Sequence, residues 1–94
     1  MPDPERMVIW KHQFPPMAAG MEVELLRDAK VLHFAEQHGQ FCFWEIHHQS
    51  ETATKRRVFQ IIGTGHPADV DPGRHIATCL VHGGDYVFHL FEVD

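Results

Sequence analysis

The residues best suited to bind another molecule lie in two glycine-rich stretches of this chain. They are Gly63-Thr64-Gly65-His66-Pro67 and, further along, His82-Gly83-Gly84. Glycines let several backbone N–H groups converge on an anion, to which Thr64 and His66 could add hydrogen-bond donors. Arg74 begins the apolar run between the two stretches, and its guanidinium could close one side of such an anion site. The candidate ligand-binding or partner-binding residues are therefore Gly63, Thr64, Gly65, His66, Arg74, His82, Gly83 and Gly84.

A purely conformational role is the alternative for the same residues. The phosphate loops of P-loop and dinucleotide-binding folds are followed by a helix, whereas here Pro67 and Asp71-Pro72-Gly73 lead into another strand. The glycines would then serve only to shape a turn. Arg74 would form an exposed ion pair with Asp69 or Asp71, which contributes little to stability.

The histidines and cysteines do not form a pattern typical of a metal site or a catalytic site. The chain has nine histidines, but none occurs in an HxH or HxxxH spacing, and the adjacent His47 and His48 would point to opposite faces of a strand. Cys42 and Cys79 stand alone and read as buried thiols, because a disulfide would need their strands to be neighbours. Ser50 lies in a polar loop. We predict no catalytic residue, no metal ligand and no cofactor, and a metal-binding or hydrolytic domain is the lesser alternative.

Length and charge restrict the class of protein. A chain of 94 residues is one domain, residues 1–94, with residues 1–6 expected to be a flexible N-terminus. Its net charge of -5 argues against direct nucleic-acid binding, which needs a basic face. No segment reaches the ~20 apolar residues of a membrane span. The N-terminus has neither a basic region nor an apolar one, so we expect a cytoplasmic protein with no membrane association.

The hydrophobic pattern indicates strands throughout. Three single strands are expected in Met7 to Phe14, Met21 to Leu25 and Arg56 to Ile62. Two hairpins are expected, Ala29 to His48 around His38-Gly39 and Arg74 to Val93 around Gly83-Gly84. The predicted fold is all-β, a small antiparallel sandwich or partly open barrel of about six to seven strands built from hairpins.

Equal pairing about each hairpin loop gives a residue-by-residue register. Around His38-Gly39 the expected pairs are Phe34 with Phe43, Ala35 with Cys42 and Val31 with Ile46. Around Gly83-Gly84 they are Cys79 with Phe88, Ala77 with Leu90, Ile76 with Phe91 and His75 with Glu92. Both faces of the first hairpin are largely apolar, so it must be covered by a second sheet or by a partner chain.

One set of segments covers most of the chain: Ile62 to Pro67, Pro72 to Arg74, His82 to Gly84, Val87 to Glu92, Ile9 to Lys11 and Ala29 to Trp44. In these segments the chain resembles a family of small bacteriophage and prophage proteins. This resemblance implies a phage origin and a cytoplasmic setting in the host cell. The family supplies no catalytic or binding residues to carry over.

Two functions of different class follow. The first is a non-catalytic phage accessory protein that acts as an interaction module and blocks a host protein, in counter-defence or host takeover. Its partner would be a host or phage protein, or a second copy in a homo-oligomer. The alternative is an oligomeric sponge that binds a nucleotide or another anionic ligand at the glycine loops. We favour the first, because a net charge of -5 with only eight Lys and Arg residues leaves few cations for phosphates.

Overall fold

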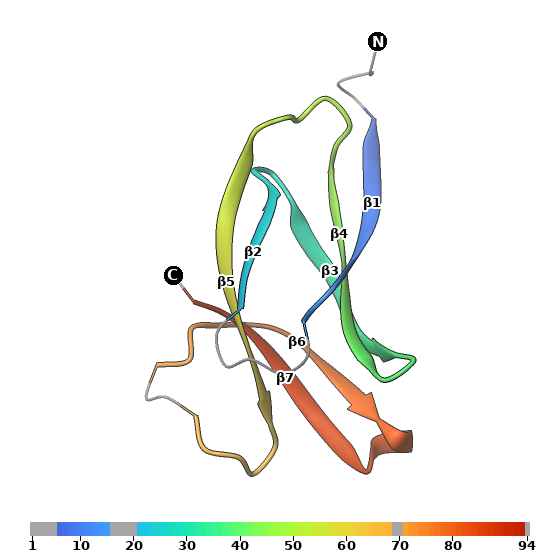
Figure 1. Cartoon of the computed structure of the whole chain (residues 1–94), viewed down its shortest axis with the longest axis vertical. Helices are drawn as coiled ribbons and strands as arrows, with labels where there is room; N and C mark the ends of the chain where they lie inside the picture. The colour runs from blue at the N-terminus through green and yellow to red at the C-terminus, as the bar shows by residue number, and fades with distance from the viewer. Residues whose placement is uncertain (1–5, 16–20, 69–70, 94) are drawn as a thin grey trace.

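The fold is an open sandwich of two antiparallel sheets (Figure 1). A computed structural model describes residues 6–15, 21–68 and 71–93, so the expected flexible segment 1–6 falls almost wholly outside the described residues. The strands are β1 Met7–Gln13, β2 Met21–Leu26, β3 Lys30–Gln37, β4 Gln40–His48, β5 Thr54–Gly63, β6 Arg74–Val81 and β7 Tyr86–Val93. One sheet has the order β1-β4-β3 and the other the order β2-β5-β7-β6. The all-β prediction is confirmed, and the two sheets do not close into a barrel.

Aromatic side chains from both sheets form the centre of the core. The Phe14 ring, just beyond β1, lies 4.9 Å from the Phe43 ring of β4 and 5.9 Å from the Phe59 ring of β5. Phe34 and Leu90 are also completely buried. Alternate residues of a strand point to one face, which is how each sheet presents an apolar layer to the other.

The first hairpin confirms the predicted turn but not the whole register. His38 and Gly39 adopt φ values of 54° and 82°, and Phe34 lies opposite Phe43 as expected. A bulge between Val31 and His33 then shifts the pairing. Val31 therefore lies opposite Glu45 instead of Ile46, which corrects the predicted pair.

The second hairpin also keeps the predicted pairing near its turn and departs from it beyond a bulge. Cys79 pairs with Phe88 and Ala77 with Leu90, as predicted, but a bulge between His75 and Ala77 moves the remaining pairs by one residue. Arg74, and not His75, lies opposite Glu92, while His75 lies opposite Phe91. Equal pairing about a turn fails beyond a bulge, because the bulge sets two residues of one strand against one of the other.

The two sheets come together along their edge strands β3 and β6, which lie beside each other. β3 is the edge of the three-stranded sheet and β6 the edge of the four-stranded sheet. Both bulged segments lie near the starts of these strands, so the irregular parts of the two hairpins face the same region.

Candidate functional site

The two glycine stretches lie at the same end of the four-stranded sheet (Figure 1). β5 ends at Gly63, opposite Phe88 of β7, and the backbone N–H of Thr64 donates to the carbonyl oxygen of Val87 at 2.9 Å. The short 3-10 turn His82–Gly84 (η1) is separated from β7 only by Asp85. A hollow of about 200 Å³ at this end is lined by Gly63, Thr64, His66, Asp85, Tyr86, Val87 and Phe88. The predicted site residues, Arg74 excepted, are thus brought to one end of the sheet.

The glycine-loop end offers hydroxyl and imidazole groups instead of cations. Both ring nitrogens of His89 are hydrogen-bonded to threonine hydroxyls, Nε2 to Thr64 at 2.8 Å and Nδ1 to Thr78 at 3.0 Å. His75 Nε2 lies 2.9 Å from the same Thr78 hydroxyl. This chain of contacts ties the Gly63 loop to the sheet. None of the described residues that line the hollow is Lys or Arg, so a phosphate there would meet no fixed positive charge.

Arg74 does not belong to this end. It is the first residue of β6, whereas the η1 turn follows the last residue of that strand, Val81. At about 3.3 Å per residue, roughly 20 Å of strand separates them. The anion site predicted from the glycine loops together with Arg74 is therefore not assembled. Nor does Arg74 pair with Asp71 in the described structure: its Nη2 donates to Oε1 of Glu92 at 3.0 Å. Asp69 lies outside the described residues.

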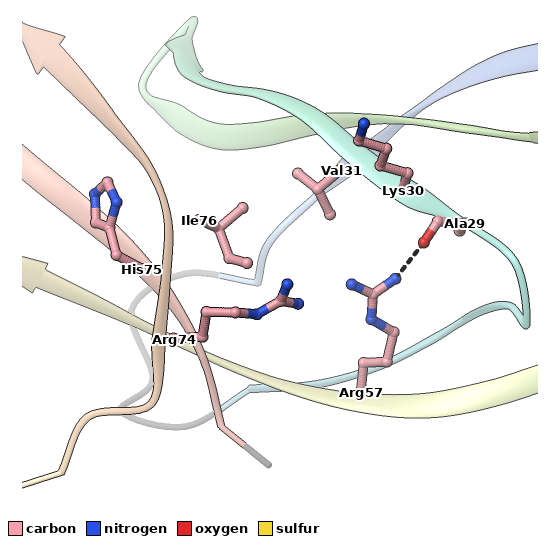
Figure 2. A pocket seen from close by; sticks show the side chains of 7 residues that line it. All are labelled: Ala29, Lys30, Val31, Arg57, Arg74, His75 and Ile76. Atoms are coloured by element: carbon pink, nitrogen blue, oxygen red, sulfur yellow. Dashed lines mark hydrogen bonds between the residues drawn. The ribbon is translucent and has the colours of Figure 1, made fainter.

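Arg74 instead lines a different pocket, which we call the arginine pocket (Figure 2). It has a volume of about 440 Å³ and is lined by Ala29, Lys30, Val31, Arg57, Arg74, His75 and Ile76. Arg57 is fixed there: Nε and Nη2 donate to the two oxygens of Glu92, both at 2.7 Å, and Nη1 donates to the Ala29 carbonyl oxygen at 2.7 Å. This fork geometry suits a guanidinium and not a lysine ammonium. Arg57 thereby joins β5, β7 and the chain just before β3.

Two backbone features place Arg74 beside Glu92. The first is the bulge of β6, which sets Arg74 opposite Glu92. The second is Gly73, whose φ of 101° favours glycine and whose Cα approaches the next strand so closely that a Cβ would overlap the Glu92 carbonyl oxygen. Bulges are over-represented beside functional sites, where they re-aim a side chain.

The carboxylate of Glu92 is held in its charged form. Glu92 is buried, with 8% of its surface exposed. Hydrogen bonds from Arg57, opposed by burial and assisted by the charges of Arg57 and Arg74, lower the pKa of Glu92 below its ordinary value. The carboxylate neutralises one guanidinium, so the two arginines together leave a net positive charge at the pocket.

A second buried carboxylate lies on the inner face of the other sheet, and the sequence pattern did not indicate it. Glu45 is fully buried, with Oε1 2.7 Å from His47 Nδ1 and Oε2 2.9 Å from His12 Nε2. The Trp10 ring lies edge-on to the His47 ring at 4.6 Å, and His12 stacks on Phe43 at 4.9 Å. Both oxygens of Glu45 have an imidazole partner, which offsets the cost of burying the carboxylate.

The cysteines are two free, buried thiols, as the sequence predicts. They lie on different sheets, Cys42 on β4 and Cys79 on β6. Burial, and secondarily the charge of Glu36, raises the pKa of Cys79 to about 11. A thiol with that pKa is almost entirely protonated at neutral pH, and the protonated form is a poor nucleophile.

No group of three or more His, Cys, Asp or Glu side chains in the described part of the chain could hold a metal ion. No helix within residues 6–15, 21–68 and 71–93 is long and apolar enough to span a membrane.

Comparison with known proteins places the chain in a family. No curated protein and no solved structure matches it. A family model described as "Domain of unknown function (DUF7352)" matches residues 6–94. Since this match covers nearly the whole sequence, the chain belongs to the DUF7352 family.

Proposed function

We propose that this chain is a non-catalytic protein-binding module whose contact surface is the edge strand β1. One observation carries the proposal: of the six large hydrophobic side chains exposed in the described part of the chain, three lie on this strand. They are Met7, Ile9 and Trp10, which are 45%, 56% and 50% exposed. Within the described structure β1 pairs only with β4, so its other backbone edge is open. An open strand edge that carries apolar side chains is a template for another strand.

The positions of these side chains favour strand addition over contact with one face. Ile9 and Trp10 are consecutive in a strand, so they point to opposite faces of the sheet. A partner that covered one face would leave the other residue exposed. A strand that pairs with the free edge of β1 brings its own side chains beside both residues, because cross-strand neighbours lie close on each face. Backbone hydrogen bonds would supply affinity, and the side chains would supply specificity.

The partner we propose is a host protein with an accessible extended segment. The resemblance to phage and prophage proteins supports a setting in the cytoplasm of a host cell, where a small binding protein would act by blocking a host factor in counter-defence or host takeover. β1 carries one fixed charge, Lys11, among otherwise neutral and apolar residues. The segment that pairs with it should therefore be apolar on both faces and free of its own lysines or arginines opposite Lys11.

The experiment compares two lysine substitutions. Ile9→Lys places a charge in the proposed interface, whereas Leu80→Lys changes a side chain that is 65% exposed on β6. The chain is used to isolate a complex from host cytoplasm, and hydrogen exchange of the β1 amides is measured in the free and bound states. We expect Ile9→Lys to abolish the complex, Leu80→Lys to retain it, and the β1 amides to exchange more slowly when bound.

A complex that survives Ile9→Lys, or that leaves exchange at β1 unchanged, would contradict strand addition. Native mass spectrometry of the purified chain shows whether the partner is instead a second copy. A dimer that Ile9→Lys dissociates would keep β1 as the interface and replace the host protein with a homo-oligomer.

An anionic or nucleotide ligand at the glycine loops is the second candidate. It is supported by the position of both loops at one end of the sheet, beside a hollow of about 200 Å³. It is weakened because Arg74, the one cation predicted for that site, lies at the other end of β6. A nucleotide panel that stabilises the protein against heat, and loses this effect in Thr64→Val, would favour this candidate.

A further inference from the structure

We propose that the arginine pocket binds the phosphate group of a small phosphomonoester. This site is separate from the β1 edge and from the glycine-loop end, and the inference stands whether or not β1 binds a partner. Its volume of about 440 Å³ lies within the usual range of small-molecule pockets, roughly 300–1,000 Å³.

The donors that remain unused at the pocket point to an anion. Arg57 spends three of its N–H groups on Glu92 and Ala29. Arg74 makes one hydrogen bond, to Glu92, among the residues that the structure describes, and its side chain is 67% exposed. Figure 2 shows the guanidinium groups of Arg57 and Arg74 directed toward one another across the pocket. Both groups already donate to Oε1 of Glu92, and an oxyanion bound beside that carboxylate would receive their remaining N–H groups.

The charge of the pocket favours a dianion. Arg57 and Arg74 face the single carboxylate of Glu92, which leaves one positive charge. Lys30 adds a second at the rim, with its side chain directed away from the two guanidinium groups in Figure 2. None of the described residues that line the pocket is acidic. A phosphomonoester carries about -1.5 to -2 at neutral pH, which this excess neutralises, whereas a sulfate ester or a carboxylate carries less.

The rest of the lining suits an organic group attached to the phosphate. Val31 and Ile76 point toward each other on one side of the pocket, and Ala29 is buried beside Arg57 (Figure 2). The two bulges of the sandwich, one in β3 and one in β6, both adjoin this lining. Apolar walls with a few convergent polar groups are typical of small-molecule sites.

The test titrates phenyl phosphate into the full chain, with phenyl sulfate and benzoate as probes of lower charge, at constant ionic strength. Binding is followed by amide NMR shifts of residues 29–31 and 74–76. We expect phenyl phosphate to bind more tightly than either other probe. Arg74→Ala should weaken it roughly tenfold or more, and Lys30→Ala roughly twofold to fivefold.

Arg56→Ala is the matched control. The Arg56 side chain is 66% exposed, similar to that of Arg74, but it lies on the face of β5 opposite to Arg57. The substitution removes the same charge without touching the pocket, so affinity should be retained. Absence of shifts at residues 29–31 and 74–76 would overturn the proposal. So would an equal loss in Arg56→Ala and Arg74→Ala, which would indicate general electrostatic attraction. Phenyl sulfate binding as tightly as phenyl phosphate would refute the assignment to a dianion.

Each variant is first checked for folding by its urea unfolding midpoint. If Arg74→Ala does not fold, the comparison between Lys30→Ala and Arg56→Ala decides in its place. In that case, equal affinities for phenyl phosphate in these two variants would refute the site.

Discussion

Replacing Arg57 with Met should remove a large part of the stability of this domain. The substitution keeps an unbranched apolar stem but deletes three hydrogen bonds, two to the Glu92 carboxylate and one to the Ala29 carbonyl oxygen. Removing one partner of a buried ion pair costs about 3–5 kcal/mol, because the other charge stays buried. Arg74 remains beside Glu92, so we expect the lower end, about 3 kcal/mol. The total free energy of unfolding of a small domain is only about 5–15 kcal/mol.

Urea unfolding followed by tryptophan fluorescence measures this cost. At an m-value of about 1–3 kcal/mol per molar, the midpoint should fall by at least about 1 M. The double variant Arg57→Met with Glu92→Leu should recover most of the loss, because buried ion pairs are often replaced by apolar residues at little cost. A loss below about 1 kcal/mol for Arg57→Met alone would show that water already solvates the Glu92 carboxylate.

Arg57→Met should also change how the free energy of unfolding depends on pH in the acid range. Because the pKa of Glu92 is lowered in the folded protein, its stabilising contribution is present above the unfolded value, near 4.5, and is lost as the pH falls through the folded value. The difference in unfolding free energy between wild type and Arg57→Met should therefore shrink as the pH is lowered from 5 to 3. A difference that stays constant across this range would mean that Arg57 does not stabilise the charged form of Glu92.

Two further experiments, a glycine substitution and a thiol-labelling reaction, test the fold. Gly73→Ala should lower the free energy of unfolding by more than the roughly 1 kcal/mol expected for Gly39→Ala. Both glycines have positive φ, but only at position 73 would a Cβ overlap the Glu92 carbonyl oxygen. Equal urea midpoints for the two variants would refute that close approach. Both cysteines are buried, and the pKa of Cys79 is raised to about 11. They should therefore react with a thiol reagent at pH 8 only as the chain unfolds. Rapid labelling of the native protein would contradict their burial.

The parts of the fold set by local chemistry could be predicted from the sequence. A turn at His38-Gly39 requires two positive φ angles, which glycine accepts freely, and the apolar runs on either side pair about it. Phe34 and Phe43 therefore lie opposite each other as expected. The Gly63 loop likewise ends β5, although β5 and β7, which bring this loop beside Val87, pair over a long sequence separation that no local pattern fixes.

The arginine pocket could not be predicted, because it depends on two bulges. A bulge leaves no strong mark in the sequence, yet each one shifts every pair beyond it by a residue. Equal pairing set His75 opposite Glu92, and the actual partner is Arg74. The pocket also requires β3 of one sheet to lie beside β6 of the other, and hairpin patterns alone do not determine how two sheets pack.

The inward position of Glu45 could not be predicted from the hydrophobic pattern either. In β4 the apolar Trp44 and Ile46 alternate with Glu45 and His47, which by hydropathy alone would favour Trp44 and Ile46 as the core-facing set. The structure reverses this assignment for Glu45 and His47, which are both buried. Imidazoles from two strands satisfy the carboxylate, a pairing that appears only once β1 lies against β4.

The edge position of β1 has a consequence for the order in which the chain folds. The hairpins β3–β4 and β6–β7 close over short turns, whereas β1 must find β4 across the part of the chain that contains β2 and β3. Loop closure over a longer distance costs more entropy, so β1 should dock after the hairpins have formed. Until then, the vacant side of β4 can accept the first strand of another nascent copy, and exchange of β1 between two chains is the natural misassembly of this topology.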